Sequence, residues 1–271
     1  MFTLPLNATY CVTGGTSGIG LEIARLLLQS SPPCRVLIVA RRSKELEMTV
    51  AMLAQECEDP DRILGAIADV STPSGRSAVS SAVNAAFDGV LTGLINNVGC
   101  NVRKQALEQT EGEYDAMVQT NMSSTYFLSK LLSPYLFKQA KEDVSNGSVV
   151  VNVSSMAGVY SSGTGAVYGM TKAAVNSLTR SLACEWSKFG VRVNCVAPWM
   201  TVTPMLEEAV KKDPSALDKV KEWTPMGRLA LPEEAAGPVV FLCTKASGFM
   251  TGTVLNVDGG LGAQGFDGPC C

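Results

Sequence analysis

Short apolar runs alternate with amphipathic stretches along most of the chain. Seven runs have the length of a buried strand, and they lie at about 8–13, 35–40, 62–68, 89–95, 148–153, 191–197 and 253–257. Helical patterns follow these runs, including stretches at 43–57, 110–140 and 232–243 and one that ends at about residue 88. Strands that alternate with helices indicate parallel pairing. The pattern therefore predicts an α/β fold with one doubly wound, seven-stranded parallel sheet and helices on both faces.

No repeat or linker divides the sequence, so we expect a single domain over residues 1–271. Residues 204–230 form the least regular large stretch. Because ligands of such sheets bind beyond the carboxyl ends of the strands, we expect the segment at about 199–230 to cover a substrate as a lid. A helix pair that packs its methionines into the core is the alternative.

Composition and charge narrow the function classes. The chain is 46% hydrophobic and its formal net charge is -3, so we expect neither nucleic acid nor a membrane as a partner. No apolar run has the length of a bilayer span, and the first residues lack the pattern of a signal peptide, which makes a cytoplasmic location the expectation. The chain has 0 histidines, which excludes a Ser-His-Asp triad and a His-ligated metal site, and we expect no metal.

The 9 cysteines are scattered. Four of them lie within predicted strands or helices, at Cys11, Cys184, Cys195 and Cys243. This placement favours small buried side chains over a disulfide framework. For Cys270 and Cys271, a lipidation or redox site and an unstructured tail are the alternatives.

The candidate chemistry lies in residues 149–180. The apolar run that ends at Val153 leads to Ser155, and a glycine- and serine-rich loop then leads to a helical segment with Tyr168 and Lys172. The i, i+4 spacing places the phenol and the ammonium on one helix face, where the cation favours the phenolate. A tyrosine that exchanges its proton suits general acid/base chemistry, and the serine hydroxyl would hydrogen-bond the reacting oxygen. These residues suit the interconversion of a carbonyl and an alcohol.

The same spacing occurs at Tyr126 and Lys130. These residues lie in a long amphipathic stretch, and no serine-bearing strand end precedes them. We therefore expect Tyr126 to be a half-buried tyrosine on a helix surface.

The segment TGGTSGIG, residues 13–20, follows the first strand and opens a helix. Such a turn lets backbone N–H groups approach a pyrophosphate at a helix N-terminus. The spacing differs from the general G-x-G-x-x-G fingerprint and is typical of the short-chain dehydrogenase/reductase family. Residues 149–180 resemble the active-site signature of the same family. The resemblance implies a Rossmann-like strand order and a nicotinamide cofactor.

The resemblance also implies roles for single residues. Ser155, Tyr168 and Lys172 correspond to the catalytic serine, tyrosine and lysine, and Ser154 is then a structural neighbour. Asn121, in an Asn-x-x-Ser segment within the predicted helix, corresponds to the asparagine that completes a catalytic tetrad and holds a relay water. An asparagine inside a helix is mildly unfavourable, which agrees with a polar role.

Arg41 and Arg42 follow the second strand, where an NAD-preferring enzyme would carry Asp or Glu. Guanidinium groups suit a 2′-phosphate, so we expect NADP(H) as the cofactor. Arg41 resembles the basic residue of the family at this place, and Arg42 equally fits a solvated helix start. Many NADP-preferring members also carry a basic residue inside the glycine turn, where this chain has Ser17.

Other cofactor contacts are implied by the resemblance alone. Asp69 would meet the adenine amino group, and an N-cap of the next helix is the alternative. Asn96-Asn97-Val98-Gly99 resembles the Asn-Asn-Ala-Gly motif. The expected cofactor site comprises Gly14, Thr16, Ser17, Gly18, Ile19, Gly20, Arg41, Arg42, Asp69, Val70, Asn97, Val98, Gly99, Tyr168, Lys172, Pro198, Thr201 and Thr203. This divides the chain into a cofactor half at about 8–100 and a catalytic and substrate half at about 101–271.

Several short segments resemble tropinone reductases and their plant relatives, including Trp199 after Pro198, Arg103-Lys104 and the C-terminal Gly265-Phe266. This resemblance implies an NADP(H)-dependent oxidoreductase that interconverts a small-molecule ketone and a secondary alcohol, as a homotetramer or homodimer. The expected substrate residues are Ser155, Tyr160, Tyr168, Trp199 and Met205. Glu207, Glu208 and Asp213 in the lid are the candidates to face a substrate ammonium, whereas a neutral hydrophobic ketone would equally suit Trp199, Met200, Tyr160 and Met205.

Two alternatives remain open. A 3-oxoacyl-acyl-carrier-protein reductase would use Arg103 and Lys104 to meet an acidic carrier. A non-catalytic NADP-binding protein would have no need to keep the four catalytic candidates together.

Overall fold

The structure is a computed structural model, and it describes residues 2–211 and 215–264. The expectations for Asp213, Gly265-Phe266, Cys270 and Cys271 concern positions outside the described residues.

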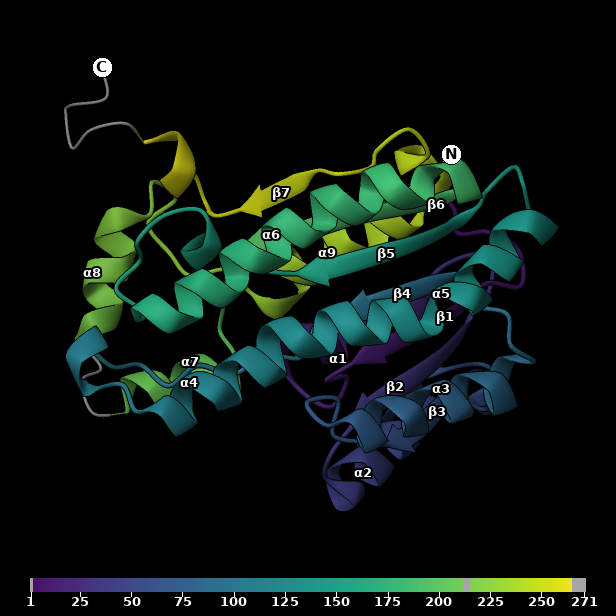
Figure 1. Ribbon diagram of the computed structural model, residues 1–271, viewed down its shortest axis with the longest axis horizontal. Helices are drawn as coiled ribbons and strands as arrows, with labels where there is room; N and C mark the ends of the chain where they lie inside the picture. Colours follow the sequence, from purple (N-terminus) through teal and green to yellow (C-terminus); the bar gives the residue numbers. More distant parts are fainter. Residues whose placement is uncertain (1, 212–214, 265–271) are drawn as a thin grey trace.

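The described strands form one 7-stranded parallel sheet in the order β3-β2-β1-β4-β5-β6-β7 (Figure 1). The strands are β1 Thr9–Thr13, β2 Arg35–Ala40, β3 Ile63–Ile67, β4 Gly93–Asn96, β5 Ser148–Val153, β6 Val191–Pro198 and β7 Val254–Val257. The strand order reverses between β1 and β4, and this is where doubly wound sheets open a crevice for ligands. The predicted fold class and strand order are confirmed.

Helices cover both faces of the sheet. One face is packed by α1 Gly18–Gln29, α2 Ser43–Glu56 and α9 Pro232–Cys243. The other is packed by α3 Pro73–Phe87, α5 Ser124–Glu142 and α6 Ala166–Trp186. Because strand neighbours such as Cys11 and Val12 are buried in opposite layers, the strands read as continuous apolar runs. None of the described helices combines the length and apolarity needed to cross a membrane.

Three shorter helices lie beyond the carboxyl ends of the strands (Figure 1). They are α4 Glu111–Met117, α7 Pro204–Val210 and α8 Ala216–Trp223. The last two form the helix pair that was one interpretation of residues 204–230. The methionines of residues 204–230 do not enter the core, however, because Met205 of α7 and Met226, which follows α8, are both exposed.

A buried polar network fixes the carboxyl ends of the central strands. Asn96 of β4 donates to Asn152 of β5 at 2.9 Å and to Ser129 of α5 at 3.0 Å. Asn152 in turn donates to Thr179 of α6 at 2.9 Å. Because buried amides are costly without partners, this network selects the register that pairs Asn96 with Asn152.

The fourth strand begins later than predicted, at Gly93 instead of residue 89. Gly89 has a φ of +66°, and the Val90 N–H donates to the Phe87 carbonyl, so these residues belong to the turn that ends α3. The apolar pattern cannot distinguish this turn from the strand, because Leu91 is buried as completely as Leu94.

All cysteines of the described residues are free thiols. Cys11, Cys195 and Cys243 are buried as expected, and burial raises the pKa of Cys11 to about 12. The prediction is wrong for Cys184, which is exposed on α6, because its neighbours Leu182 and Ala183 occupy the buried face.

Two helical glycines offer a matched test of this packing. A methyl group at Gly75 of α3 would lie 1.9 Å from the Asp69 carbonyl oxygen, whereas one at Gly112 of α4 would have no neighbour outside its own helix turn within 4 Å. We expect Gly75→Ala to lower the free energy of unfolding by about 1–3 kcal/mol. Gly112→Ala should raise it by up to about 1 kcal/mol. Urea denaturation followed by circular dichroism measures both, and equal effects would contradict the packing described for α3.

Candidate active site

Two adjoining cavities lie beyond the carboxyl ends of the strands. The first cavity has a volume of about 510 Å³ and extends from the glycine turn past the ends of β2 and β3 to α6. The second cavity has a volume of about 690 Å³ and lies between β5, β6 and α7. Gly99, Cys100, Tyr168 and Thr203 are among the residues that line both. The two cavities therefore meet at the end of β4 and the start of α6.

The glycine turn brings the backbone of α1 close to that of β1. Gly14 has a φ of +68° and donates its N–H to the Val39 carbonyl at 2.8 Å. A methyl group at Gly20 would lie 2.2 Å from the Gly14 carbonyl oxygen, so only glycine fits there. Ser17, at the N-cap of α1, forms no side-chain cap, which leaves first-turn N–H groups available to an anion.

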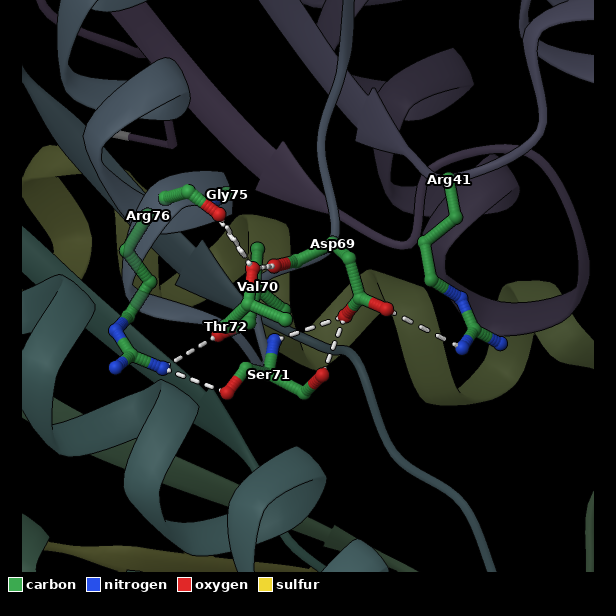
Figure 2. Close-up of polar contacts among 8 residues, drawn as sticks. Arg41, Asp69, Val70, Ser71, Thr72, Gly75 and Arg76 are labelled. Carbon is green, nitrogen blue, oxygen red and sulfur yellow. Dashed lines mark hydrogen bonds and ion pairs between the residues drawn. The ribbon is translucent and has the colours of Figure 1, made fainter.

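Arg41 and Asp69 face one another across the ends of β2 and β3 (Figure 2). Their ion pair spans 3.6 Å, and Asp69 also accepts hydrogen bonds from the Ser71 N–H and hydroxyl at 3.0 and 2.6 Å. Partial burial acts to raise the pKa of the Asp69 carboxyl, but the bonds from Ser71 and the Arg41 guanidinium outweigh it and lower the pKa. Thr72 caps α3 instead of Asp69, so the N-cap alternative for Asp69 is wrong.

The first cavity brings together nearly all of the expected cofactor residues. Only Pro198 and Thr201 of that set do not line it, and both line the second cavity. Arg42 lines the first cavity and forms an ion pair with Glu45 of α2. Thr203 lines both cavities and also caps α7, because its hydroxyl accepts from the Leu206 N–H.

Asn121 lies in a π-helical segment, Val118–Ser123, that interrupts the predicted helix between α4 and α5. Its side chain is 1% exposed and forms two bonds with the backbone of Cys100: Nδ2 donates to the carbonyl at 2.9 Å, and Oδ1 accepts from the N–H at 2.8 Å. Nδ2 also donates to the Thr171 hydroxyl at 3.0 Å. The asparagine therefore joins the loop after β4 to α6. Segments of π-helix often occur at functional sites.

Lys172 is buried beside Tyr168. The residue is 3% exposed, and Nζ donates to the Val153 carbonyl at 3.0 Å and lies 5.7 Å from the centre of the Tyr168 ring. A methyl group at Gly99 would lie 3.3 Å from Nζ and 3.6 Å from the Asn121 Oδ1. The loop after β4 thus closes over the lysine and the asparagine.

The two serines after β5 have different surroundings. Ser154 is buried and donates its hydroxyl to the Lys172 carbonyl at 3.0 Å, which agrees with a structural role. Ser155 lines the second cavity with Tyr168, and its hydroxyl accepts from the Ala157 N–H at 3.1 Å. Tyr126, in contrast, lines neither cavity and is 42% exposed, as expected.

The second cavity contains most of the expected substrate residues. Trp199 and Met205 line it, and the Trp199 indole donates to the Thr224 hydroxyl at 3.0 Å, which joins the cavity wall to the end of α8. Tyr160 does not line this cavity. Its ring is half exposed, and its hydroxyl donates to the Gly262 carbonyl at 3.3 Å.

Several residues of this region are absent from the expected set, and two of them bond to Asn121. Cys100 lines both cavities, and Thr171 connects Asn121 to α6. Only their positions in the sequence could have indicated these two residues, because Cys100 follows the Asn-Asn-Val-Gly motif and Thr171 precedes Lys172.

Comparisons with known proteins show which families and structures the chain resembles. A family model described as enoyl-(acyl carrier protein) reductase matches residues 14–262. A chloroplastic tropinone reductase homolog of Arabidopsis thaliana is 42% identical over 94% of this chain and 76% of its own length. Among solved structures, the Pseudomonas aeruginosa RhlG/NADP active-site complex is 31% identical, with a TM-score of 0.86, over 96% of this chain and 98% of the other. A short chain dehydrogenase/reductase family protein is 31% identical, with a TM-score of 0.80, over 94% and 97%.

The Asn121 contacts predict an asymmetric effect of mutation on stability. Asn121→Ala leaves the N–H and the carbonyl of Cys100 without their partner, and we expect a loss of about 2–4 kcal/mol in the free energy of unfolding. Thr171→Val removes the acceptor of one Asn121 bond and the donor to the Tyr168 carbonyl at nearly constant volume, and it should cost about 1–2 kcal/mol. Urea denaturation measures both values. A loss for Asn121→Ala no larger than that for Thr171→Val would contradict the described role of the asparagine.

Proposed function

This chain belongs to the short-chain dehydrogenase/reductase family of oxidoreductases, and on that premise we propose that it interconverts a ketone and a secondary alcohol with NADP(H). The observation that supports this most is that Tyr168 lines both cavities. A proton donor at the junction of a nucleotide cavity and a largely apolar cavity is what carbonyl reduction requires.

The first cavity suits a dinucleotide. The glycine turn and the uncapped N-terminus of α1 would hold the pyrophosphate. Asp69 and Val70 would border the adenine, and Lys172 would bind the nicotinamide ribose. Lys172 gives one of its three N–H donors to Val153, which leaves two for hydroxyls of the ribose. When bound, the nicotinamide supplies the hydride for reduction or accepts it in oxidation.

In the proposed mechanism, Tyr168 donates its hydroxyl proton to the ketone oxygen as a C–H bond forms at the carbonyl carbon. The ketone, one hydride and one proton give the secondary alcohol, and the reverse reaction returns the proton to the phenolate. Ser155 hydrogen-bonds the same oxygen and holds the carbonyl toward the tyrosine. The Lys172 ammonium stabilises the phenolate through its charge.

The Asn121 amide has few hydrogen-bonding positions left for the relay water. Both Nδ2 hydrogens are donated, to Cys100 and Thr171, and Oδ1 already accepts one bond from Cys100. We therefore assign the water to the remaining lone pair of Oδ1, on the side of Gly99 and Lys172. From there it would return a proton to the tyrosine through the lysine.

NADP(H) over NAD(H) is proposed from the residues at the end of β2. Arg41 and Arg42 line the first cavity there, and their present partners are the carboxylates of Asp69 and Glu45. Two guanidinium groups suit a 2′-phosphate better than a ribose hydroxyl. The NADP in the similar complex from Pseudomonas aeruginosa agrees with this choice.

The lid and the assembly also remain proposals. Met205 and Leu206 of α7 line the second cavity, which supports a substrate lid at about 199–230, and we retain the cofactor half at 8–100 and the catalytic half at 101–271. The homotetramer or homodimer and the cytoplasmic location stay predictions. One relative is named as chloroplastic, so the location needs its own measurement.

The acyl-carrier alternative receives less support. It relied on Arg103 and Lys104, but Lys104 forms an ion pair with Glu113 at 2.6 Å. The hydrogen bond from Lys104 also lowers the pKa of Glu113 to about 2, so the carboxylate of this pair stays ionised well below neutral pH.

The role of Tyr168 has an internal control. We expect Tyr168→Phe to lower kcat by about two to four orders of magnitude, because the proton donor is lost. NADPH binding, measured by calorimetry, should be retained. Tyr126→Phe removes a hydroxyl from the same spacing on another helix and should leave kcat unchanged. Turnover of Tyr168→Phe near the wild-type value would remove the tyrosine from its assigned role.

The proposed preference for NADP(H) over NAD(H) is tested with arginine variants at the two ends of β2. Arg41→Ala should raise the KM for NADPH by about tenfold, because a charge-assisted bond to the 2′-phosphate is lost, and should leave the KM for NADH unchanged. Arg42→Ala measured alone tests whether the second guanidinium takes part. Arg35→Ala, at the amino end of β2, is the control. Equal changes for the two nucleotides would contradict the proposal.

A further inference from the structure

The second cavity has an excess of positive charge. The charged side chains that line it, among the described residues, are Arg103, Glu208 and Lys211. Glu208 and Lys211 form an ion pair with each other, so their charges offset. Arg103 forms no hydrogen bond or ion pair with another described residue. The guanidinium of Arg103 in the wall of this cavity therefore has no counterion among the described residues.

The loop that carries Arg103 is held on both sides. Asn101 donates to the Thr164 carbonyl at 3.1 Å, and the Val102 N–H donates to the Met117 sulfur at 3.4 Å. On the other side, Lys104 is bound to Glu113 at 2.6 Å. The backbone at Arg103 is thus positioned without any contact from its own guanidinium, which leaves that group for a ligand.

The described carboxylates of the lid do not suit a substrate ammonium. Glu208 is already paired with Lys211, and Glu207 is exposed and does not line the second cavity. The expectation that these residues face a cation is therefore not supported by their positions. The remaining wall is largely apolar, with Trp199 and Met205 among its members.

We propose that Arg103 selects substrates that carry a carboxylate on an apolar body, so that the enzyme acts on oxo acids and the corresponding hydroxy acids. The inference rests on the proposed function. A guanidinium binds a carboxylate through two parallel N–H···O bonds, and the apolar wall of the cavity would contact the body of the substrate. The ketone then lies at Ser155 and Tyr168, and the carboxylate lies at the loop after β4.

The test uses three six-membered cyclic ketones that differ in charge: 4-oxocyclohexanecarboxylate, its methyl ester and 1-methyl-4-piperidone. We measure kcat/KM with NADPH for the wild type and for Arg103→Ala, Arg103→Glu and Arg180→Ala. Arg180→Ala is the control, because it removes an exposed arginine from α6 that lines neither cavity.

The wild type should prefer the carboxylate to its ester by about tenfold, the value of one charge-assisted contact. Arg103→Ala should remove this preference and leave the rate with the ester unchanged. Arg103→Glu should reverse it in favour of the piperidone, and Arg180→Ala should behave as the wild type. A wild type that uses the ester or the piperidone as well as the carboxylate would overturn the inference and leave the proposed reaction intact.

A complete lack of turnover would count against the proposed function instead. The inference is then decided by calorimetry with cyclohexanecarboxylate in the presence of NADP: a Kd about tenfold higher in Arg103→Ala supports it, and an equal Kd overturns it. A strong preference for an acyl-carrier thioester over all three ketones, lost in Arg103→Ala, would assign the cation to a carrier protein and would also overturn it.

Discussion

Lys172 places a positive charge where 3% of the residue is exposed, and no described carboxylate forms an ion pair with it. A buried charge is costly unless dipoles or a counterion compensate it. The protein compensates with the Val153 carbonyl and the Tyr168 ring, and a methyl group at Gly99 would come within 3.3 Å of Nζ. The end of β5, the start of α6 and the loop after β4 must therefore stay in register around one ammonium group.

The polar residues of the core serve that same requirement. The amides of Asn96 and Asn152 join β4 to β5 and also contact α5 and α6, so the elements that surround Lys172 are held by side-chain bonds as well as by packing. Asn121 adds a second connection between the loop after β4 and α6. Such a network offsets the cost of desolvation only when every member has a hydrogen-bond partner. This requirement favours one arrangement of these strands and helices over others.

The sequence predicts the parts of this structure that depend on the spacing of neighbouring residues along the chain. Strands buried on both faces leave apolar runs, so the sheet could be predicted, and i, i+4 spacing places Tyr168 and Lys172 together. The start of β4 could not be predicted, because a buried turn and a buried strand have the same apolar pattern. Likewise, nothing in the pattern of 110–140 marks the π-helical segment, where Asn121 bonds to partners far away in the sequence. The position of Tyr160 also depends on a distant partner, the carbonyl of Gly262.

The π-helical segment changes the direction in which the side chains before it point, relative to those of α5. Each residue of an α-helix turns the chain by about 100°, so a wider turn at Val118–Ser123 rotates α4 relative to the face that α5 presents. In an uninterrupted α-helix, Asn121 and Ser124 would lie on the same face, because residues three apart are neighbours there. The wider turn alters that relation, so the direction in which the Asn121 amide reaches Cys100 depends on the hydrogen-bonding pattern of a 6-residue backbone segment.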